Sequence, residues 1–253
     1  MNLKKSQRTY LIGLERNRLN GGAIASFLSL TSDNGKVGPS AQVWFLNPDV
    51  DPMTDYHSGA PSACPKGCPR IDDLTCYVEK ARAPLAIFQA FQRGNTPELR
   101  PELYAEAFRI ARAKGSRILR FGADGDPATV DPRMLYALRD AAMAEGFEGW
   151  TGYTHAWASR RADALRGLVM ASVDDVREAR AARRRGWRTF RVSADPCDDA
   201  TEAGEVRCPA SAERGNVATC GTCKLCDGAS GTVRPSVLIR GHGAGFAGAE
   251  WQV

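Results

Sequence analysis

The residues best suited to chemistry in this chain are its eight cysteines, most of which fall into two clusters. The first cluster comprises Cys64, Cys68 and Cys76. The second cluster comprises Cys208, Cys220, Cys223 and Cys226, while Cys197 stands apart. Thiolates are soft ligands, and cysteines a few residues apart can reach one metal from a single loop. The clusters therefore predict metal centres, without naming the metal.

The second cluster has the stronger metal-binding pattern, because its last three members are spaced C-x2-C-x2-C. Four thiolates fit either a structural zinc ion or a [4Fe–4S] cluster. Ferredoxins share this spacing, which favours iron and sulfide, whereas zinc sites more often use two separated C-x2-C pairs. Both metals remain open from the residues alone.

The first cluster, spaced C-x3-C-x7-C, offers three ligands. Three thiolates on a cubane leave one iron open to a cofactor or substrate. Alternatively, Cys197 or a histidine such as His57 supplies a fourth ligand and closes a zinc site. An arrangement in which the two clusters meet and share ligands is also compatible with the sequence.

Polar residues recur where predicted strands end. Asp124 and Asp126 follow one strand, and His155 follows the next. We predict that these three are catalytic, because parallel α/β folds bind ligands at the carboxyl ends of their strands. Cofactor contacts are predicted for Gly122, Asp124, Tyr153, Thr154, Ser172 and Ser193. The alternative is that such residues only cap the helices that follow, which we favour for Asp174 and Asp175.

The elements that must position these residues alternate between strand and helix. Apolar runs predict strands at 41–46, 117–121, 149–155, 167–171, 187–192 and 236–239. Helical periodicity and capping residues predict helices at 77–93, 102–114, 131–145, 156–165 and 174–185. This alternation implies a parallel α/β sheet, most simply a partial (β/α)6 barrel of TIM-like type, with an open doubly wound sheet as the alternative. No G-x-G-x-x-G or Walker A motif indicates a nucleotide site.

The chain divides into three parts by composition. These are an N-terminal extension (1–40), an α/β core (41–195) that carries the first cysteine loop (64–76), and a cysteine-rich C-terminal segment with the last strand and tail (196–253). No apolar run approaches the roughly 20 residues of a membrane-spanning helix, and no signal-peptide pattern opens the sequence. With thiols that stay reduced to bind metal, we predict a cytoplasmic protein without a membrane partner.

The net charge of +5, from 34 basic and 29 acidic residues, allows nucleic-acid contact without arguing for it. The densest basic stretch is 177–191. We interpret it as an exposed helix end whose cations oppose the helix dipole, with phosphate binding as the alternative.

Four motifs in order resemble a family of phage and plasmid proteins, the phage gene product 88 domain group. They are Cys64-Pro-Lys-Gly-Cys68-Pro with Cys76-Tyr77, Gly122-Ala-Asp-Gly-Asp-Pro127, Gly152-Tyr-Thr-His155, and the segment from Cys208-Pro to Cys226. The resemblance covers about residues 60 to 230. It implies a protein of mobile genetic elements but no particular activity.

The layout also resembles, more distantly, the radical S-adenosylmethionine enzymes. Those enzymes place a three-cysteine loop after the first strand of a partial (β/α)6 barrel, and an open iron of the cubane binds S-adenosylmethionine. The resemblance implies that the first cluster holds such a cubane and that the second holds an auxiliary one. The chain departs from the usual spacing, because seven residues rather than two separate Cys68 from Cys76, and Tyr77 follows the last cysteine instead of preceding it.

Three functional hypotheses follow. The first is a phage- or plasmid-type iron–sulfur protein with one or two [4Fe–4S] clusters that cleaves S-adenosylmethionine, with Asp124, Asp126 and His155 at the cofactor or substrate. The second is a zinc-stabilised nucleic-acid-binding protein of replication or regulation. Its phosphate contacts would be Arg180, Arg183, Arg184 and Arg185. The third is hydrolysis by a divalent ion held by the same two aspartates and histidine. No motif identifies the substrate or the oligomeric state.

Overall fold

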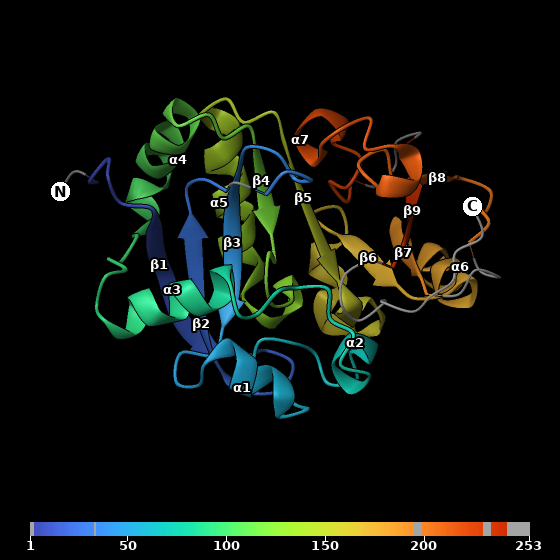
Figure 1. Ribbon diagram of the computed structural model, residues 1–253, viewed down its shortest axis with the longest axis horizontal. Helices are drawn as coiled ribbons and strands as arrows, with labels where there is room; N and C mark the ends of the chain where they lie inside the picture. Colours follow the sequence, from blue (N-terminus) through green and yellow to red (C-terminus); the bar gives the residue numbers. More distant parts are fainter. Residues whose placement is uncertain (1–2, 33, 195–198, 230–233, 242–253) are drawn as a thin grey trace.

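The structure is a computed structural model that describes residues 3–32, 34–194, 199–229 and 234–241. Cys197 lies outside these ranges. Within them, nine strands form one sheet with the spatial order β1-β2-β3-β4-β5-β6-β7-β9-β8 (Figure 1). The strands are β1 (Thr9–Arg16), β2 (Ala23–Ser29), β3 (Ser40–Leu46), β4 (Ile118–Phe121), β5 (Gly149–Thr154), β6 (Met170–Val173), β7 (Thr189–Ser193), β8 (Glu205–Arg207) and β9 (Ser236–Arg240).

Six neighbouring strands, from β3 to β7 and then β9, are parallel and lie side by side in chain order. This confirms an α/β protein with a mainly parallel sheet. The sheet is open, with β1 and β8 at its edges, so a barrel is not confirmed. The predicted N-terminal extension of residues 1–40 contributes β1 and β2, an antiparallel hairpin that continues the sheet beyond β3.

One side of the sheet, which we call the helix face, is covered by α4 (Tyr104–Ala113), α5 (Pro132–Ala144) and α6 (Val176–Arg184). Alternate strand residues point to this side and are fully buried there, among them Phe45, Leu119 and Phe121. Burial of each such side chain contributes about 1.5–3 kcal/mol. This core holds the parallel strands in place and leaves the opposite side to carry other groups.

The opposite side, the cysteine face, holds α3 (Ala83–Gln92) in front of the sheet (Figure 1) and both cysteine clusters. The intervening strand residues point here, because successive side chains of a strand face opposite ways. They include Trp44 of β3, Arg120 of β4, Tyr153 of β5 and Phe190 of β7, which line one cavity. The cysteine face therefore places strand side chains between the clusters.

Several predicted elements differ from the structure at their ends. The predicted helix 77–93 begins only at Ala83, because Pro84 fits the first turn of a helix but not its interior. The predicted helix 156–165 is two 3-10 segments, η3 (His155–Ala158) and η4 (Arg160–Leu165). Three short helices were not predicted: α1 (Pro52–His57), α2 (Pro69–Asp72) and α7 (Cys220–Cys223). In the part of the chain described here, no helix is long and apolar enough to cross a bilayer.

Candidate functional site

The first cysteine group, defined as Cys64, Cys68 and Cys76, lies in the loop that follows β3. The three side chains pack with Tyr56 of α1 and Ile71 of α2 in one small cluster. Cys68 is buried at the start of α2, and the other two cysteines are half-buried. The Tyr56 hydroxyl accepts a hydrogen bond from the Cys76 N–H at 3.2 Å. The loop thus brings together three thiols separated by up to twelve positions.

The loop after β4 holds this group against the sheet. The Asp126 N–H donates to the Ala63 carbonyl at 2.8 Å, next to Cys64 in the chain, and the Phe45 N–H donates to the Asp124 carbonyl at 2.9 Å. Gly125 makes the close approach with φ of +77°, and a Cβ there would stand 2.5 Å from the Phe45 carbonyl oxygen. Only glycine meets both conditions without strain.

A buried cation lies beside the first cysteine group. Lys80 forms an ion pair with Asp124, and both side chains are under a tenth exposed. Burial acts to lower the pKa of Lys80, but Asp124 and the sulfurs of Cys76 and Cys64 outweigh it and raise the pKa. Burial raises the pKa of the Cys64 thiol, and Lys80 opposes that shift. Lys80 is therefore a permanent positive charge next to sulfurs that need one to ionise.

His155 and Asp174 form a second charged pair beside this group. His155 Nε2 lies 3.7 Å from Asp174 Oδ2, and Arg70 Nε donates to Asp174 Oδ1 at 3.0 Å. Burial acts to lower the pKa of His155, but Asp174 and Cys68 raise it to about 10. The imidazole is therefore charged at neutral pH and faces a thiol as well as a carboxylate.

Asp126 joins the ends of two strands. One oxygen of its carboxylate accepts from Thr154 Oγ1 at 2.7 Å and from the Ala128 N–H at 2.8 Å, and the other accepts from the His155 N–H at 2.8 Å. Its carboxylate and the Thr154 hydroxyl thus already have partners, and both cap short 3-10 turns, η2 (Pro127–Thr129) and η3. Asp126 and Thr154 were both predicted as site residues. In the structure their side chains stabilise the backbone at His155.

The second cysteine group, defined as Cys208, Cys220, Cys223 and Cys226, surrounds a small cavity of about 30 Å³. Cys208 follows β8, and α7 carries the next two members at its ends. The backbone N–H groups of Cys220 and Gly221 donate to the carbonyls of Lys36 and Val37, at 3.1 and 3.0 Å. Because those carbonyls precede β3, this group lies at the amino ends of the strands, whereas the first lies at their carboxyl ends (Figure 1).

The surroundings of the second group are mainly apolar. Its sulfurs pack with side chains of the β6, β7 and β9 strands, namely Met170, Phe190, Val192, Val237 and Ile239. Burial raises the pKa of Cys208 to about 11, against the opposing influence of Lys36. Burial also raises the pKa of Cys226, and a hydrogen bond from Tyr153 counteracts it. Without bound cations these thiols hold their protons at neutral pH.

Arg188, which directly precedes β7, anchors the loop that ends the second group. Its guanidinium pairs with Asp227 at 2.7 Å and donates to the carbonyls of Leu225 and Pro235, both at 2.6 Å. The guanidinium and the carboxylate are each about a tenth exposed. The loop after Cys226 is therefore held by a buried salt bridge and by two further hydrogen bonds from the same guanidinium, whose Nε has no partner among the described residues.

Tyr153 of β5 stands between the two groups. It lines the small cavity at the first group, the cavity at the second group and the larger cavity between them. Among the described residues, the cysteines that influence the pKa values of Cys64, Cys76, Cys208, Cys220 and Cys226 belong in each case to the same group. The two groups are thus separate, and all seven described cysteines are free thiols.

The other predicted site residues fall into two sets. Gly122 lines the cavity of the first group, with φ of +66°. Ser172 is buried and alternates onto the cysteine face with Met170, and its hydroxyl has no hydrogen-bond partner among the described residues. Ser193 alternates to the other side, because it shares the orientation of Arg191 rather than of Val192. Of these three, only Ser193 lies away from the cysteine face.

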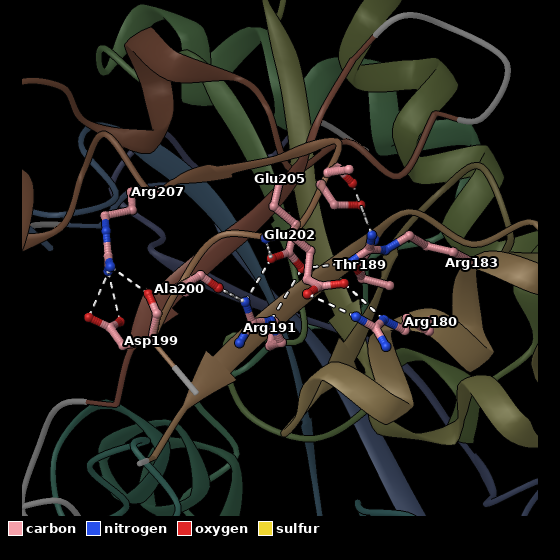
Figure 2. A network of polar contacts seen from close by, with 11 residues as sticks. Arg180, Arg183, Thr189, Arg191, Asp199, Ala200, Glu202, Glu205 and Arg207 are labelled. Carbon is pink, nitrogen blue, oxygen red and sulfur yellow. Dashed lines mark hydrogen bonds and ion pairs between the residues drawn. The ribbon is translucent and has the colours of Figure 1, made fainter. Parts of the chain in front are cut away.

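The basic stretch 177–191 is exposed in part: Arg177 and Arg180 are exposed, and Arg183 and Arg184 lie in the last turn of α6, as predicted for cations that oppose a helix dipole. Figure 2 shows Arg183 and Arg191 on Glu205, each at 2.7 Å, and Arg180 on Glu202 at 2.9 Å. The Arg191–Glu205 pair is fully buried and ties β7 to β8. Three of these arginines thus have carboxylate partners, one of them fully buried, which reduces the charge left to meet phosphates.

The sequence-based predictions missed three basic residues at the site: Lys36, Lys80 and Arg120. Lys80 follows Cys76 by four positions, and Arg120 interrupts an otherwise apolar strand. An arginine between Leu119 and Phe121 was a readable signal, because a buried strand rarely carries an unpaired charge. Lys36 gave no comparable signal, since it lies in a turn region.

In the described part of the chain, no three or more His, Cys, Asp or Glu side chains have the arrangement of ligands around a single metal ion. The donor chemistry, four thiols at one end of the strands and three at the other, nevertheless suits sulfur-bound metal groups. Comparisons with family models, with curated proteins and with solved structures found no match for this chain.

Proposed function

We propose that this protein is an iron–sulfur protein of the radical S-adenosylmethionine type, related to phage and plasmid proteins. The first cysteine group would hold a [4Fe–4S] cluster with one iron free of protein ligands. The second group would hold an auxiliary cluster with four thiolates. The observation that carries the proposal is the placement of two separate groups of free thiols on one face of six parallel strands in chain order.

The strand order supports the proposal. The three-cysteine loop follows β3, the first of the six parallel strands, as the resemblance to radical enzymes requires. The loops after β4, β5 and β6 then bring Asp124, His155 and Asp174 to the same edge. A partial (β/α)6 arrangement is the finer form of this fold that we propose.

The charges around the first group suit a bound cluster. Cluster ligation requires thiolates, and burial alone keeps Cys64 and Cys76 protonated. Lys80 offsets part of the negative charge that three thiolates and a cluster would gather. When bound, the cluster would supply an electron for reductive cleavage of S-adenosylmethionine.

This chain's own residues would then position and shield the reaction. His155, charged and half-buried beside Cys68, can donate a hydrogen bond to sulfur and hold it in place. Asp126 and Thr154 orient the His155 backbone. Asp124 keeps Lys80 charged, so it acts on the thiols through the lysine. Gly122, Tyr153 and Ser172 would contact the cofactor from the cysteine face.

The test is anaerobic purification followed by iron, sulfide and zinc counts and an optical spectrum. Two clusters predict about eight irons with matching sulfide and absorbance near 400 nm. The triple variant Cys64→Ser, Cys68→Ser, Cys76→Ser should lose about half of the iron, and the corresponding Cys220, Cys223 and Cys226 variant the other half.

Cys197→Ser provides the matched control, because in the sequence this cysteine lies outside both clusters. It should keep all of the iron. One or two zinc ions without iron would contradict the proposal and would favour zinc-stabilised nucleic-acid binding, to be tested by its salt dependence. Iron without S-adenosylmethionine cleavage under reducing conditions would restrict the protein to electron storage or transfer.

A further inference from the structure

A cavity of about 350 Å³ lies on the cysteine face between the two groups. Tyr77, next to Cys76, lines one part of it, and Cys220 lines another. Its walls come from β3, β4, β5, β7 and β9. The volume falls within the range of pockets that bind small organic molecules.

Arg120 is the main charge in this cavity. It comes from the middle of β4, is half-buried, and forms no ion pair or side-chain hydrogen bond with the residues that the structure describes. Its charge acts on Tyr77 and on Cys220, so it lies between the two cysteine groups. A partly buried guanidinium without a carboxylate partner is costly unless an anion comes to it.

Lys36 adds a second cation to the same cavity. Burial lowers the pKa of Lys36, and the Arg120 charge lowers it further. The one carboxylate in the lining, Glu79, lies at the exposed side with Arg82, 3.6 Å away. Arg120 and Lys36 thus repel each other across the cavity. Because Cys208, Cys220 and Glu213 already attract Lys36, a bound anion would chiefly relieve Arg120.

The remaining walls are apolar and include several aromatic rings. Trp44 is fixed by a hydrogen bond from its indole N–H to Ser29 Oγ at 3.1 Å. The rings of Tyr153 and Phe190 lie 4.3 Å apart, with an interplanar angle of 42°. These three surfaces suit an apolar or planar part of a ligand, whereas Thr151 and Gln42 add polar atoms nearby.

We infer that this cavity binds a small organic oxyanion, a carboxylate or a phosphate ester, with its anionic group at Arg120 and Lys36 and its apolar part against the aromatic wall. The claim that this oxyanion is the substrate rests on the proposed function, since the cavity adjoins the first group. The claim that the cavity binds an oxyanion does not depend on bound iron.

Binding to the full-length protein tests the inference, with fluorescence titration of 2-naphthoate, 2-naphthyl phosphate and neutral 2-naphthamide. The anionic probes should bind more tightly than the amide, and whichever of the two binds better identifies the oxyanion. Arg120→Gln should weaken the anionic probes by about tenfold or more and leave the amide unchanged. Arg120→Lys should restore part of the affinity.

Arg117→Gln is the matched control, since Arg117 lies three positions earlier and pairs with Glu148 on the exposed edge. Equal binding of all three probes, or no effect of Arg120→Gln in a variant with unchanged thermal unfolding, would overturn the inference. Probe binding by protein that contains no iron would retain the inference and reject the proposed function. Protein that contains iron but binds no probe would reject the inference and retain the proposed function.

Discussion

The two cysteine groups lie at opposite ends of the same strands and in opposite electrostatic surroundings. The first has buried charged partners at hand, with Lys80 on Asp124 and His155 near Asp174. The second is packed among the apolar side chains of β6, β7 and β9. A site that moves electrons or protons needs groups that respond to charge, whereas a site that stores charge or holds the fold benefits from isolation. Under the proposed function, this difference would place the reaction at the first group and electron storage or structural stability at the second.

The largest expected effect tests whether the second group depends on the edge of the sheet. Glu205→Gln removes the carboxylate charge from buried Arg191 and from Arg183, and it should lower the free energy of unfolding by about 3–5 kcal/mol. Urea unfolding measures the loss, and metal analysis should show depletion of the second group first. Glu202→Gln, at an exposed partner of Arg180, should have little effect. An equal loss of unfolding free energy in the two variants would show that the buried ion pairs of Glu205 do not support the sheet edge at β8.

The next effect concerns the backbone beneath the first group. Gly125→Ala places a Cβ against the Phe45 carbonyl at a positive φ, and it should cost about 3 kcal/mol. Because the displaced loop contacts Ala63, the variant should lose metal from the first group and keep it at the second. Gly115→Ala, at φ of +96° with open space around it, should cost only about 1 kcal/mol. Equal loss of metal from both groups would show that the Gly125 loop does not support the first group selectively.

A smaller effect is expected at Asp174, where pH supplies the readout. Burial acts to raise the pKa of this carboxyl, but His155 and Arg70 lower it below the usual 3.8. Its stabilising contribution is therefore present above about pH 4 and is lost as pH falls through the depressed folded pKa. Asp174→Asn should cost about 2 kcal/mol at pH 7. The difference from the parent protein, measured by chemical unfolding, should shrink below pH 4, and a constant difference would contradict the role of charge.

The smallest effect lies between the groups. Tyr153→Phe removes a hydroxyl that accepts from Thr151 at 3.2 Å and donates to Cys226, and it should cost about 1 kcal/mol. The optical spectrum of metal at the second group should shift, while that of the first should not. Thr151→Val, which deletes only the first bond, is the control. A spectral shift at the first group alone would contradict the assignment of the Tyr153 hydrogen bond to the second group.

Much of the fold could be predicted from the sequence because the apolar pattern of buried parallel strands is strong. Most of the predicted helices and strands, such as β4 at Ile118–Phe121 and α5 at Pro132–Ala144, lie within two residues of their predicted bounds. β8 could not be predicted from the sequence, because two of its residues are charged. Glu205 is paired with Arg191, and Arg207 is paired with Asp199. Polar strands of this kind give no apolar signal.

The candidate site was predicted only in part for a related reason. The cysteine spacing located both groups, but no spacing indicates that they lie at opposite ends of the strands. Asp126 and Thr154 were predicted as site residues from their position after strands, yet their polar atoms are used within the loops. Lys80 and Arg120 were overlooked, because a single cation acquires meaning only when tertiary structure shows what surrounds it.

The position of β9 has a consequence for synthesis on the ribosome. β9 lies between β7 and β8, although both precede it in the chain. All four thiols of the second group therefore emerge before the strand whose Val237 and Ile239 side chains help to enclose them. Until residues 236–240 leave the exit tunnel, β8 lacks its pairing partner and these thiols remain accessible. The order of translation thus provides an interval in which the four thiols can be reached from solution before the fold closes over them.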